Sequence, residues 1–500
     1  MNTNAMDKVA PTTTQLPAGS HPRGLRTLFF TEMWERFSYY GMRALLVLFM
    51  VDSVRGGMGL TDKVATAIYG IYTATVYLMA LPGGWLADRI TGAQRAVWYG
   101  GIIIALGHFA LAIPSTQTFY LGLVLVVIGS GILKPNMSTM VGDLYPEGGA
   151  RRDAGFTIFY MGVNLGAAIG PMICSTLGEK WNWHYGFGAA GVGMVLGLVQ
   201  FRLSRHKLGE AGLHRGNERR LNTAERAVVP GAICALLVVL GLTMTGILTL
   251  EPVAIAHVMT AVILSIAALY FIGVFLFCGL TTVEKERVAV ILVLFLSSAL
   301  FWSGFEQAGS SFNLFAERFT ARYISSLHYE VPAGWFQMIG PVFIITCAPV
   351  FAWLWVQLAK KNLDPSIPVK FAFGLLLLAA GFLVMAGAAA VVAAGHKALP
   401  VWLITTYLVH TFGELCLSPV GLSSVTKLAP RKLVGQMMGI WFLASSLGNL
   451  LAGLVAGEFK SDSTQAWPGM YLKITILPTI AGLLLIVFAR PVKRWIGGIK

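Results

Sequence analysis

Charged residues are scarce in this chain. Only 12% of its 500 residues are Asp, Glu, Lys or Arg, whereas 56% are hydrophobic. A soluble domain would carry about 25% charged residues. We therefore expect a polytopic membrane protein with most of its residues inside the bilayer.

Several chemical signatures are missing as well. The chain has no GxxxxGK phosphate loop, no HExxH zinc motif and no CxxC pair, so nothing supports ATP-driven, zinc-dependent or thiol redox chemistry. Residues 1–22 are polar, and we expect no cleavable signal peptide. Apolar runs contain all five cysteines, which we expect to be buried packing residues: Cys174, Cys234, Cys278, Cys347 and Cys416.

Long apolar runs account for most of the chain. Reading runs of about 18–28 residues as membrane-spanning helices gives fourteen predicted spans, and their even number places both termini on one side. They lie at 26–51, 64–86, 94–113, 117–140, 154–177, 184–202, 227–249, 253–280, 287–308, 334–359, 368–394, 399–427, 434–457 and 469–490.

The basic residues are unevenly distributed. There are 37 Lys and Arg against 23 Asp and Glu, a net charge of +14. With cytoplasmic termini, about 26 of the 37 fall in cytoplasmic loops and tails, and the loop at 202–226 alone holds seven. The positive-inside rule therefore predicts cytoplasmic termini. We expect that loop to face anionic lipids, with protein docking as the alternative, and we expect no nucleic acid partner.

An internal repeat relates the two halves of the chain. "LKPNMSTMVGDLYP" (133–146) and "LSPVGLSSVTKLAP" (417–430) share Leu, Pro, Val, Leu and Pro at identical offsets, and "WERFSYYG" aligns more weakly with "WSGFEQAG". Two related six-helix bundles describe the major facilitator fold, an all-α polytopic architecture whose substrate site lies between the halves. The predicted parts are an N-terminal six-helix bundle at 1–205, a basic linker with two inserted helices at 206–285, and a C-terminal six-helix bundle at 286–500.

The first predicted span carries charges that a lipid-facing helix would not tolerate. Glu32, Arg36, Tyr40 and Arg43 are four, four and three residues apart, which puts them on one helical face, with Glu35 beside them. Each charge at the centre of a span costs roughly 2.5–3.5 kcal/mol. A stripe that faces a wet cavity, with acid and base in mutual reach, avoids much of that cost. We therefore predict that this face lines a solute or ion pathway.

Three other spans contribute one charge each: Lys134, Glu306 and Glu414. Because the repeat pairs corresponding helices, we expect an ion pair between Arg43 and Glu306. A second is expected between Lys134 and Glu414. Making and breaking these pairs would open the cavity to alternate sides. The alternative is that they are static bridges, although buried bridges often stabilise less than apolar packing of equal volume.

The neighbouring side chains suggest the cargo. A cavity with both charge signs, amphipathic aromatics and an amide suits a zwitterion with variable apolar groups better than a simple anion or a sugar. For each aromatic alone, core packing is an equally good interpretation. The residues concerned are Tyr40, Tyr77, Tyr160, Trp302, Trp441 and Asn164.

Six motifs in order resemble those of the proton-dependent oligopeptide transporter family. The first is ExxER (Glu32, Glu35, Arg36), which continues as "FSYYGMR". The others are "GSGILKPNMSTMVGDLY", "FYMGVNLGAAIGP" (159–171), "FWSGFEQ" (301–307), "GELCLSPVGLSSVTKLAP" (413–430) and "MMGIWFLASSLGN" (437–449). Six motifs along essentially the whole chain make the resemblance specific. The two extra helices, here 227–280, are also usual in bacterial members.

The resemblance implies a proton-coupled symporter that imports di- and tripeptides by alternating access across a bacterial plasma membrane. It assigns Arg36 and Lys134 to the peptide carboxylate, and Glu414 and Asn164 to the amino terminus. It assigns proton coupling to Glu32, Glu35 and Arg36 of the ExxER motif in the first helix, and to Glu306 in the seventh. Arg43 would be released when Glu306 is protonated. Tyr40, Tyr77, Tyr160, Trp302, Ser418 and Trp441 would line the side-chain pockets. We expect no metal and no cofactor besides the coupling protons, and a functional monomer.

Some positions depart from the family pattern. Gly340 stands where many members have Asn before Pro, so one contact to the peptide amine is lost or supplied by water. Gly70 stands where eukaryotic members carry His, so coupling must rest on carboxylates. We expect His108, His257 and His410 to pack rather than to relay protons. In the loop "GGWLADRITGAQR" (83–95), which resembles the superfamily signature, Asp88 and Arg89 are expected to form a conformational latch.

Other functions remain as alternatives. A drug–proton antiporter of the same superfamily would carry protons opposite to its cargo, and a nitrate-type anion carrier would not require Glu414. An enzyme is not expected, because Ser418 has no evident base and His410 with Glu414 does not form a zinc motif. A channel is disfavoured by the paired halves.

Overall fold

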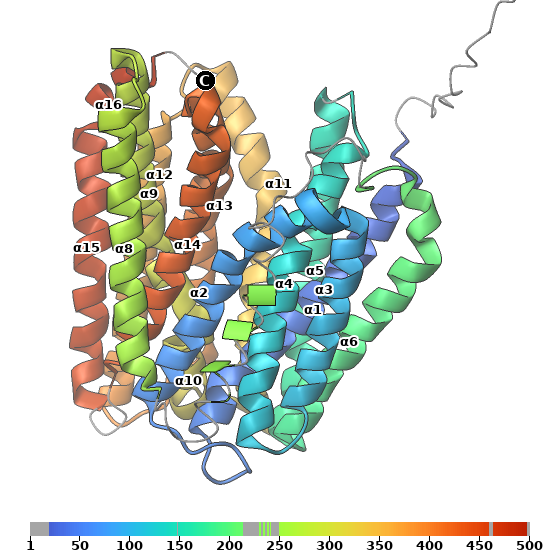
Figure 1. The fold of residues 1–500 in the computed structure, drawn as a ribbon. Helices are drawn as coiled ribbons and strands as arrows, with labels where there is room; N and C mark the ends of the chain where they lie inside the picture. Colours follow the sequence, from blue (N-terminus) through green and yellow to red (C-terminus); the bar gives the residue numbers. More distant parts are fainter. Residues whose placement is uncertain are drawn as a thin grey trace, which may run out of the picture.

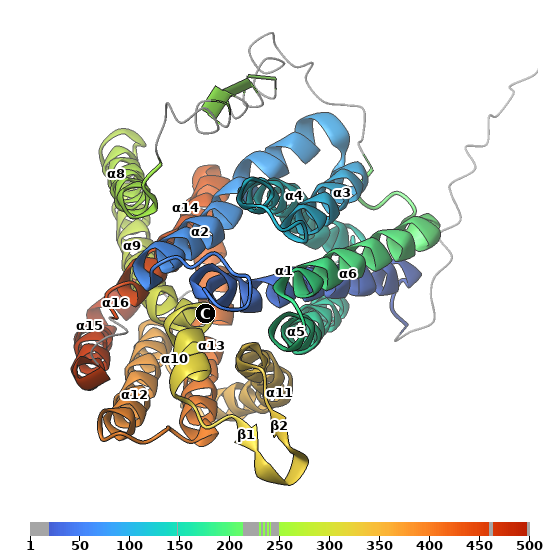
Figure 2. The same cartoon turned by 90° about the horizontal axis from the view of Figure 1, so that it is seen from below.

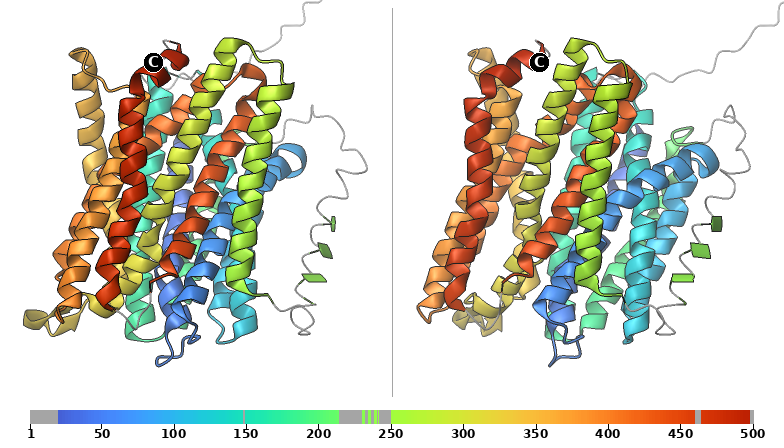
Figure 3. Two further views of the ribbon diagram at one scale, coloured as in Figure 1. Left: turned by 90° about the vertical axis from the view of Figure 1, so that its left-hand side faces the viewer. Right: turned by 60° about the vertical axis from the view of Figure 1, so that its left-hand side comes forward.

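The computed structural model describes residues 20–147, 149–213, 250–459 and 464–497, together with seven residues between 230 and 241. Long helices make up nearly all of it (Figure 1, Figure 3). The first half contains α1 (Arg23–Val51), α2 (Asp62–Leu86), a π-helical turn η1 (Ala87–Thr91), α3 (Ala93–Leu111), α4 (Thr116–Asp143), α5 (Gly149–Lys180), α6 (Trp183–Ser204) and a 3-10 turn η2 (Arg205–Leu208).

The second half follows an outer helix, α8 (Pro252–Phe277), which packs against α2 and α14. Its elements are α9 (Thr282–Phe305), η3 (Glu306–Gly309), α10 (Ser311–Phe319), β1 (Tyr323–Ile324), η4 (Ser325–Leu327), β2 (Tyr329–Glu330), η5 (Ala333–Met338), α11 (Ile339–Lys360), α12 (Ile367–Ala393), α13 (Pro400–Leu428), η6 (Arg431–Leu433), α14 (Val434–Ala456), η7 (Thr464–Ala466), α15 (Trp467–Val487) and α16 (Ala489–Ile496). The two strands form an antiparallel hairpin that pairs Tyr323 with Glu330.

The described helices match the predicted spans. Thirteen of the fourteen coincide with one described helix each, and the span predicted at 227–249 lies largely outside the described residues. Ten described helices are long and apolar enough to cross a membrane. The helix α1 is not among the ten, because every stretch of 18 residues within it contains at least three charges. The prediction of an all-α polytopic membrane protein is confirmed for the described part of the chain.

Local signals explain where several helices begin. The Thr61 hydroxyl accepts a hydrogen bond from Val64 N at the start of α2. At the start of α9, Thr281 and Glu284 form a reciprocal capping box. Proline occupies the first turn of α8, α12, α13 and α15, where its missing N–H leaves no bond unmade.

The two ends of the molecule differ in what they carry. The start of α1 and the short helix α16 lie at one end, which we call the terminal end, at the top of Figure 1. The hairpin of β1 and β2, with α10, lies at the opposite end, which we call the hairpin end and which faces the viewer in Figure 2. Viewed from there, α1–α6 form one half of the molecule and α9–α15 the other.

The apolar core also differs between the ends. One large cluster of buried side chains draws on both halves, and includes Leu45 of α1 and Phe312 of α10. A smaller cluster lies entirely within the first half, from Leu25 on α1 to Leu208 on η2. The halves therefore share a core toward the hairpin end, whereas the first half has a core of its own at the terminal end.

Small residues bring key helices close together. A Cβ added to Gly166 of α5 would lie 2.9 Å from both Arg36 Cβ and Phe37 N of α1. Between the halves, a Cβ on Gly70 of α2 would lie 3.1 Å from Gly453 Cα of α14. Such glycine contacts let helix backbones approach closely in membranes. The contact between α1 and α5 thereby fixes the position of the charged face of α1.

Most cysteines are at least partly buried, as expected from the sequence. Cys174 and Cys416 are buried, Cys278 and Cys347 are half-buried, and all five are free. The expectation was wrong for Cys234, which is exposed on a helical turn whose described neighbours are also exposed.

Candidate functional site

The charged face of α1 is buried. Glu32, Glu35 and Arg36 are at most 8% exposed. Arg36 Nε lies 2.6 Å from Glu32 Oε1 and 3.2 Å from Glu35 Oε2, so one guanidinium serves two carboxylates. Neither Glu35 oxygen has a hydrogen-bond partner among the described residues. A buried carboxylate with unused acceptor sites is unusual in a purely structural role, since burying polar groups without partners is costly.

The second charged pair joins the two halves. Arg43 Nη2 of α1 lies 2.5 Å from Glu306 Oε2, at the junction of α9 and η3. These are the expected partners. Arg43 Nε also donates to Tyr69 Oη at 2.6 Å, and the guanidinium lies 5.5 Å from the centroid of the Tyr40 ring. Its role as a gate stays a prediction.

Lys134 does not pair with Glu414 in this structure, so the expected bridge is wrong for this conformation. Its Nζ lies instead 4.8 Å from the Tyr39 ring centroid and 4.7 Å from that of Tyr77, a cation–π arrangement. The two residues lie on α4 and α13, in different halves, and Lys134 is held against two tyrosine rings of its own half.

Glu414 of α13 is buried, and its Oε2 has no hydrogen-bond partner among the described residues. Tyr160 and Tyr40, which belong to the other half, interact electrostatically with the Glu414 carboxylate. Lys134 in turn lies within electrostatic reach of Glu35, Glu32 and Glu306. The charged residues predicted from four separate spans therefore occupy one central region.

The remaining candidate residues have mixed surroundings. Asn164 of α5 is buried and donates to Tyr160 O within its own helix at 2.9 Å. Trp441 is buried against Phe371, so it fits the packing interpretation as well as that of a cavity wall. Partly exposed or exposed positions are held by Tyr40, Tyr77, Tyr160, Trp302 and Ser418.

The histidines lie outside this cluster. His108 is fully buried and, among the described residues, neither ring nitrogen has a partner. His410 is buried, with Nε2 3.1 Å from Leu378 O. Packing is therefore the simplest description of both. The expectation was wrong for His257, which is exposed on α8.

Sequence reasoning missed a network at the hairpin end. Glu179, in the last turn of α5, accepts hydrogen bonds from Ala333 N at 2.7 Å and Gly334 N at 2.8 Å, which open η5 in the other half. Arg322 lies 4.0 Å from the same carboxylate. A detectable signal existed, because an acid in the last turn of a helix opposes the helix dipole and calls for another partner.

Further contacts join the halves at the same end. Arg318 binds both oxygens of Asp62 at 2.6 and 2.7 Å, and Arg55 Nη2 lies 3.1 Å from Glu317 Oε1. Trp335 Nε1 donates to Thr176 Oγ1 at 2.9 Å. The hairpin end is therefore closed by several polar contacts between the halves.

A cavity of about 500 Å³ lies between the halves at the terminal end. The first turns of α5 and the last turns of α13 line it, with Arg152, Asp153 and Phe156 on one side and Ser423 and Thr426 on the other. Closure at one end, a cavity between the halves at the other and a buried charged cluster in the long apolar helices are together the features of a membrane transporter.

Comparison with known proteins gives the family. The family model described as "POT family" matches residues 94–471, and the chain belongs to that family. "Peptide transporter YePEPT" of Yersinia enterocolitica is 44% identical over 501 residues, covering 97% of this chain and 98% of that protein. A "Di-/tripeptide transporter" of Lactococcus lactis subsp. cremoris is 35% identical, covering 96% and 97%.

Solved structures agree. A crystal structure of a peptide transporter, POT, in complex with sulfate superposes with a TM-score of 0.88 at 41% identity, covering 97% of this chain and 98% of that one. A POT family transporter in complex with 5-aminolevulinic acid gives 0.85 at 34% identity, covering 94% and 97%. The predictions of the major facilitator fold and of this family are confirmed.

Proposed function

We propose that this chain is a proton-coupled symporter that imports di- and tripeptides by alternating access. One observation carries the proposal: an ion pair between the halves, Arg43 with Glu306, lies beside the buried ExxER cluster in a chain of the POT family. The relatives whose printed names give a peptide cargo support the substrate class.

The substrate roles follow the charges. Arg36 and Lys134 bind the peptide carboxylate, because the third cation of the central region, Arg43, is held by Glu306. Glu414 binds the amino terminus together with Asn164, and its unused Oε2 supports that assignment. Side-chain pockets are lined by Tyr40, Tyr77, Tyr160, Trp302, Ser418 and Trp441.

Proton coupling rests on carboxylates. A proton on Glu306 removes the charge that holds Arg43, and so weakens one of the contacts that join the two halves. Glu32 and Glu35 share Arg36, so peptide binding to that guanidinium changes how strongly it holds their charges. Each proton supplies roughly 2.3 kcal/mol per 100 mV and about 1.4 kcal/mol per pH unit. Together these terms allow accumulation of several hundredfold.

The orientation and the parts of the molecule belong to the same proposal. The terminal end faces the cytoplasm of a bacterial cell, as the distribution of basic residues favours, so the structure is inward-facing. Residues 1–205 and 286–500 act as the two moving bundles, with 206–285 as linker and inserted helices. The transporter works as a monomer.

The test is proton-driven uptake of dialanine into proteoliposomes that contain the full chain. Wild type should accumulate dialanine when the outside is acidic, and Glu306→Gln should lose accumulation while keeping exchange of internal against external peptide. Glu458→Gln, at an exposed partner of Lys63, is the matched control. Undiminished accumulation by Glu306→Gln would refute the coupling role, and cargo movement opposite to the proton gradient would refute symport.

A further inference from the structure

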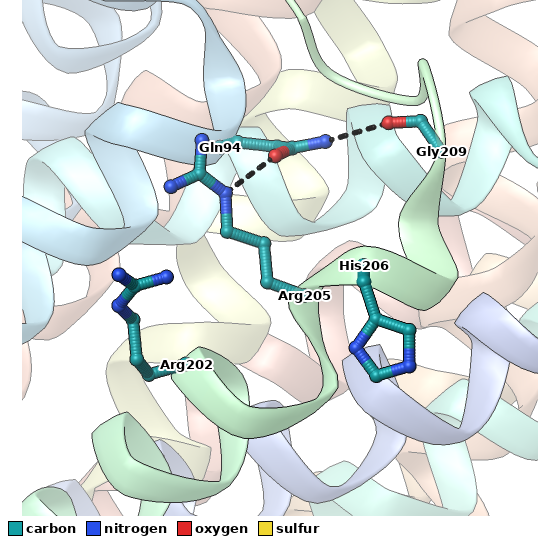
Figure 4. A pocket seen from close by; sticks show the side chains of 5 residues that line it. All are labelled: Gln94, Arg202, Arg205, His206 and Gly209. Carbon is teal, nitrogen blue, oxygen red and sulfur yellow. Dashed lines mark hydrogen bonds between the residues drawn. The ribbon is translucent and has the colours of Figure 1, made fainter.

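A second cavity, of about 420 Å³, lies outside the transport pathway. It is formed at the terminal end of the first half, where α6 ends and η2 begins, against the start of α3. Gln94, Arg202, Arg205, His206 and Gly209 line it (Figure 4). Two guanidinium groups and an imidazole thus share one pocket, and no Asp or Glu is among the described residues that line it.

The pocket is held in shape by Gln94, which is buried. Its side-chain nitrogen donates to Ala211 O at 2.7 Å and to Gly209 O at 3.3 Å, and its Oε1 accepts from Arg205 Nε at 2.8 Å (Figure 4). Gly209 has φ +57°, a conformation that glycine adopts without strain, and it turns the chain back toward α3. The turn and the orientation of Arg205 are therefore fixed by the fold.

The cations of this pocket have unused donors. Among the described residues, Arg205 makes its side-chain hydrogen bond through Nε alone, which leaves both terminal nitrogens available. Arg202 has no hydrogen bond or ion pair with any described residue, and its guanidinium extends to the same side as that of Arg205 in Figure 4. Like charges three residues apart on one helical face repel each other, so an anion between them would relieve that repulsion.

The surface beside the pocket is apolar. Val199 and Leu203 of α6 are 50% and 72% exposed, and Tyr99 of α3, which packs against α6, is 54% exposed. On a membrane-spanning helix such side chains contact acyl chains. A group bound by the two arginines would therefore lie at the boundary between the hydrocarbon and the polar layer.

We propose that this pocket binds a phosphate group, supplied by the headgroup of an anionic phospholipid or by a soluble phosphate ester. Planar guanidinium groups with free terminal nitrogens match phosphate oxygens in pairs. Basic pockets between spanning helices at this kind of surface are typical sites for anionic headgroups. The proposal does not depend on the transported substrate.

The test measures binding of fluorescent phosphatidylglycerol to the full chain purified in neutral detergent. Arg202→Gln/Arg205→Gln should weaken the apparent affinity by at least about tenfold. The double variant Lys360→Gln/Lys361→Gln removes two exposed charges from the end of α11 and should change it by less than about twofold. Arg202→Gln alone keeps the bond between Arg205 and Gln94, so its expected loss of about fivefold does not reflect misfolding.

The second arm identifies the source of the phosphate. Displacement of the lipid by glycerol 3-phosphate supports a soluble phosphate ester, and failure of displacement supports the lipid headgroup. Wild-type affinity in Arg202→Gln/Arg205→Gln would overturn the proposal, as would equal binding of zwitterionic phosphatidylcholine. The lipid-binding assay does not involve transport. A negative result would therefore refute the phosphate site without affecting the transport proposal, and a negative transport result would not affect the phosphate site.

Discussion

The hairpin end and the terminal end hold the two halves of this transporter in different ways. From the central region to the hairpin end, ion pairs cross from one half to the other: Arg43 with Glu306, Arg55 with Glu317, Asp62 with Arg318 and Lys63 with Glu458. At the terminal end, the described pairs of Arg151 with Glu147 and of Lys370 with Asp364 each stay within one half. The comparison teaches that this conformation is defined by polar contacts at one end.

These contacts are not of equal strength. Those of Glu179 are buried and charge-assisted, those of Asp62 are half-buried, and the pair of Lys63 with Glu458 is exposed. Burial decides the difference, because water and salt weaken an exposed pair. Removing these contacts one at a time should therefore raise the ratio of open to closed molecules at the hairpin end, and the rise should be larger for the more buried contacts.

The largest effect is expected from Glu179→Gln. The neutral amide is a weaker acceptor for Ala333 N and Gly334 N, and hydrogen bonds to a charged group contribute about 1.5–3 kcal/mol. The ratio of open to closed molecules at the hairpin end should rise about tenfold or more. Spin labels at Val54 and Leu327, both strongly exposed on opposite halves, would report it as a longer distance population. An unchanged distance distribution would show that η5 is held by other contacts.

A smaller effect is expected from Arg318→Gln. Its bond to Asp62 is bidentate but partly solvated, and such pairs contribute about 0.2–1 kcal/mol. The same labels should report a shift of less than about fivefold. Wild type and variant should converge at high salt, where surface charges are screened. A shift as large as that of Glu179→Gln would refute the ordering by burial.

The smallest effect on opening is expected from Asp52→Asn, because Asp52 acts within one half. Burial acts to raise the pKa of its carboxyl. Hydrogen bonds from the Trp183 side chain and from the backbone of Arg55 and Val54 act in the opposite direction, as does the positive charge of Arg55. These effects outweigh burial, and the pKa lies below its ordinary value. Because the pKa of Asp52 is lower in the folded protein, its ionised carboxyl stabilises the fold at any pH above its ordinary pKa. This contribution is lost as the pH falls through the lowered pKa.

The measurement is thermal unfolding in detergent over a range of pH. Asp52→Asn should lower the Tm by about 1–2 °C at pH 7, and the difference from wild type should shrink progressively as the pH falls below about 4. The label distances should stay as in wild type. A difference that stayed constant as the pH fell below about 4 would contradict the role of the Asp52 charge, and a longer distance population would contradict its assignment to one half.

The sequence carried much of this architecture. Apolar runs predicted the helices to within a few residues, because each span must satisfy its backbone internally. Helical spacing predicted the contact of Arg36 with Glu32, and the internal repeat predicted that of Arg43 with Glu306. Both depend on local geometry or on symmetry, which a sequence records.

Other features could not be read in advance. The bridge between Lys134 and Glu414 depends on how far apart the halves stand, which is a property of the conformation. The partners of Glu179 are backbone N–H groups of η5, which no residue type identifies. The pocket at Arg205 needs the return of the chain toward α3, which depends on tertiary contacts of Gln94.

The close approach of Gly70 to Gly453 has a consequence for engineering. A histidine placed at position 70, to imitate the titratable group of eukaryotic members, would meet the backbone of α14 before it met any proton donor. Such a substitution would wedge two helices apart across the interface of the halves. Any resulting change in transport would reflect the disturbed packing of α2 against α14 and would not test a proton relay.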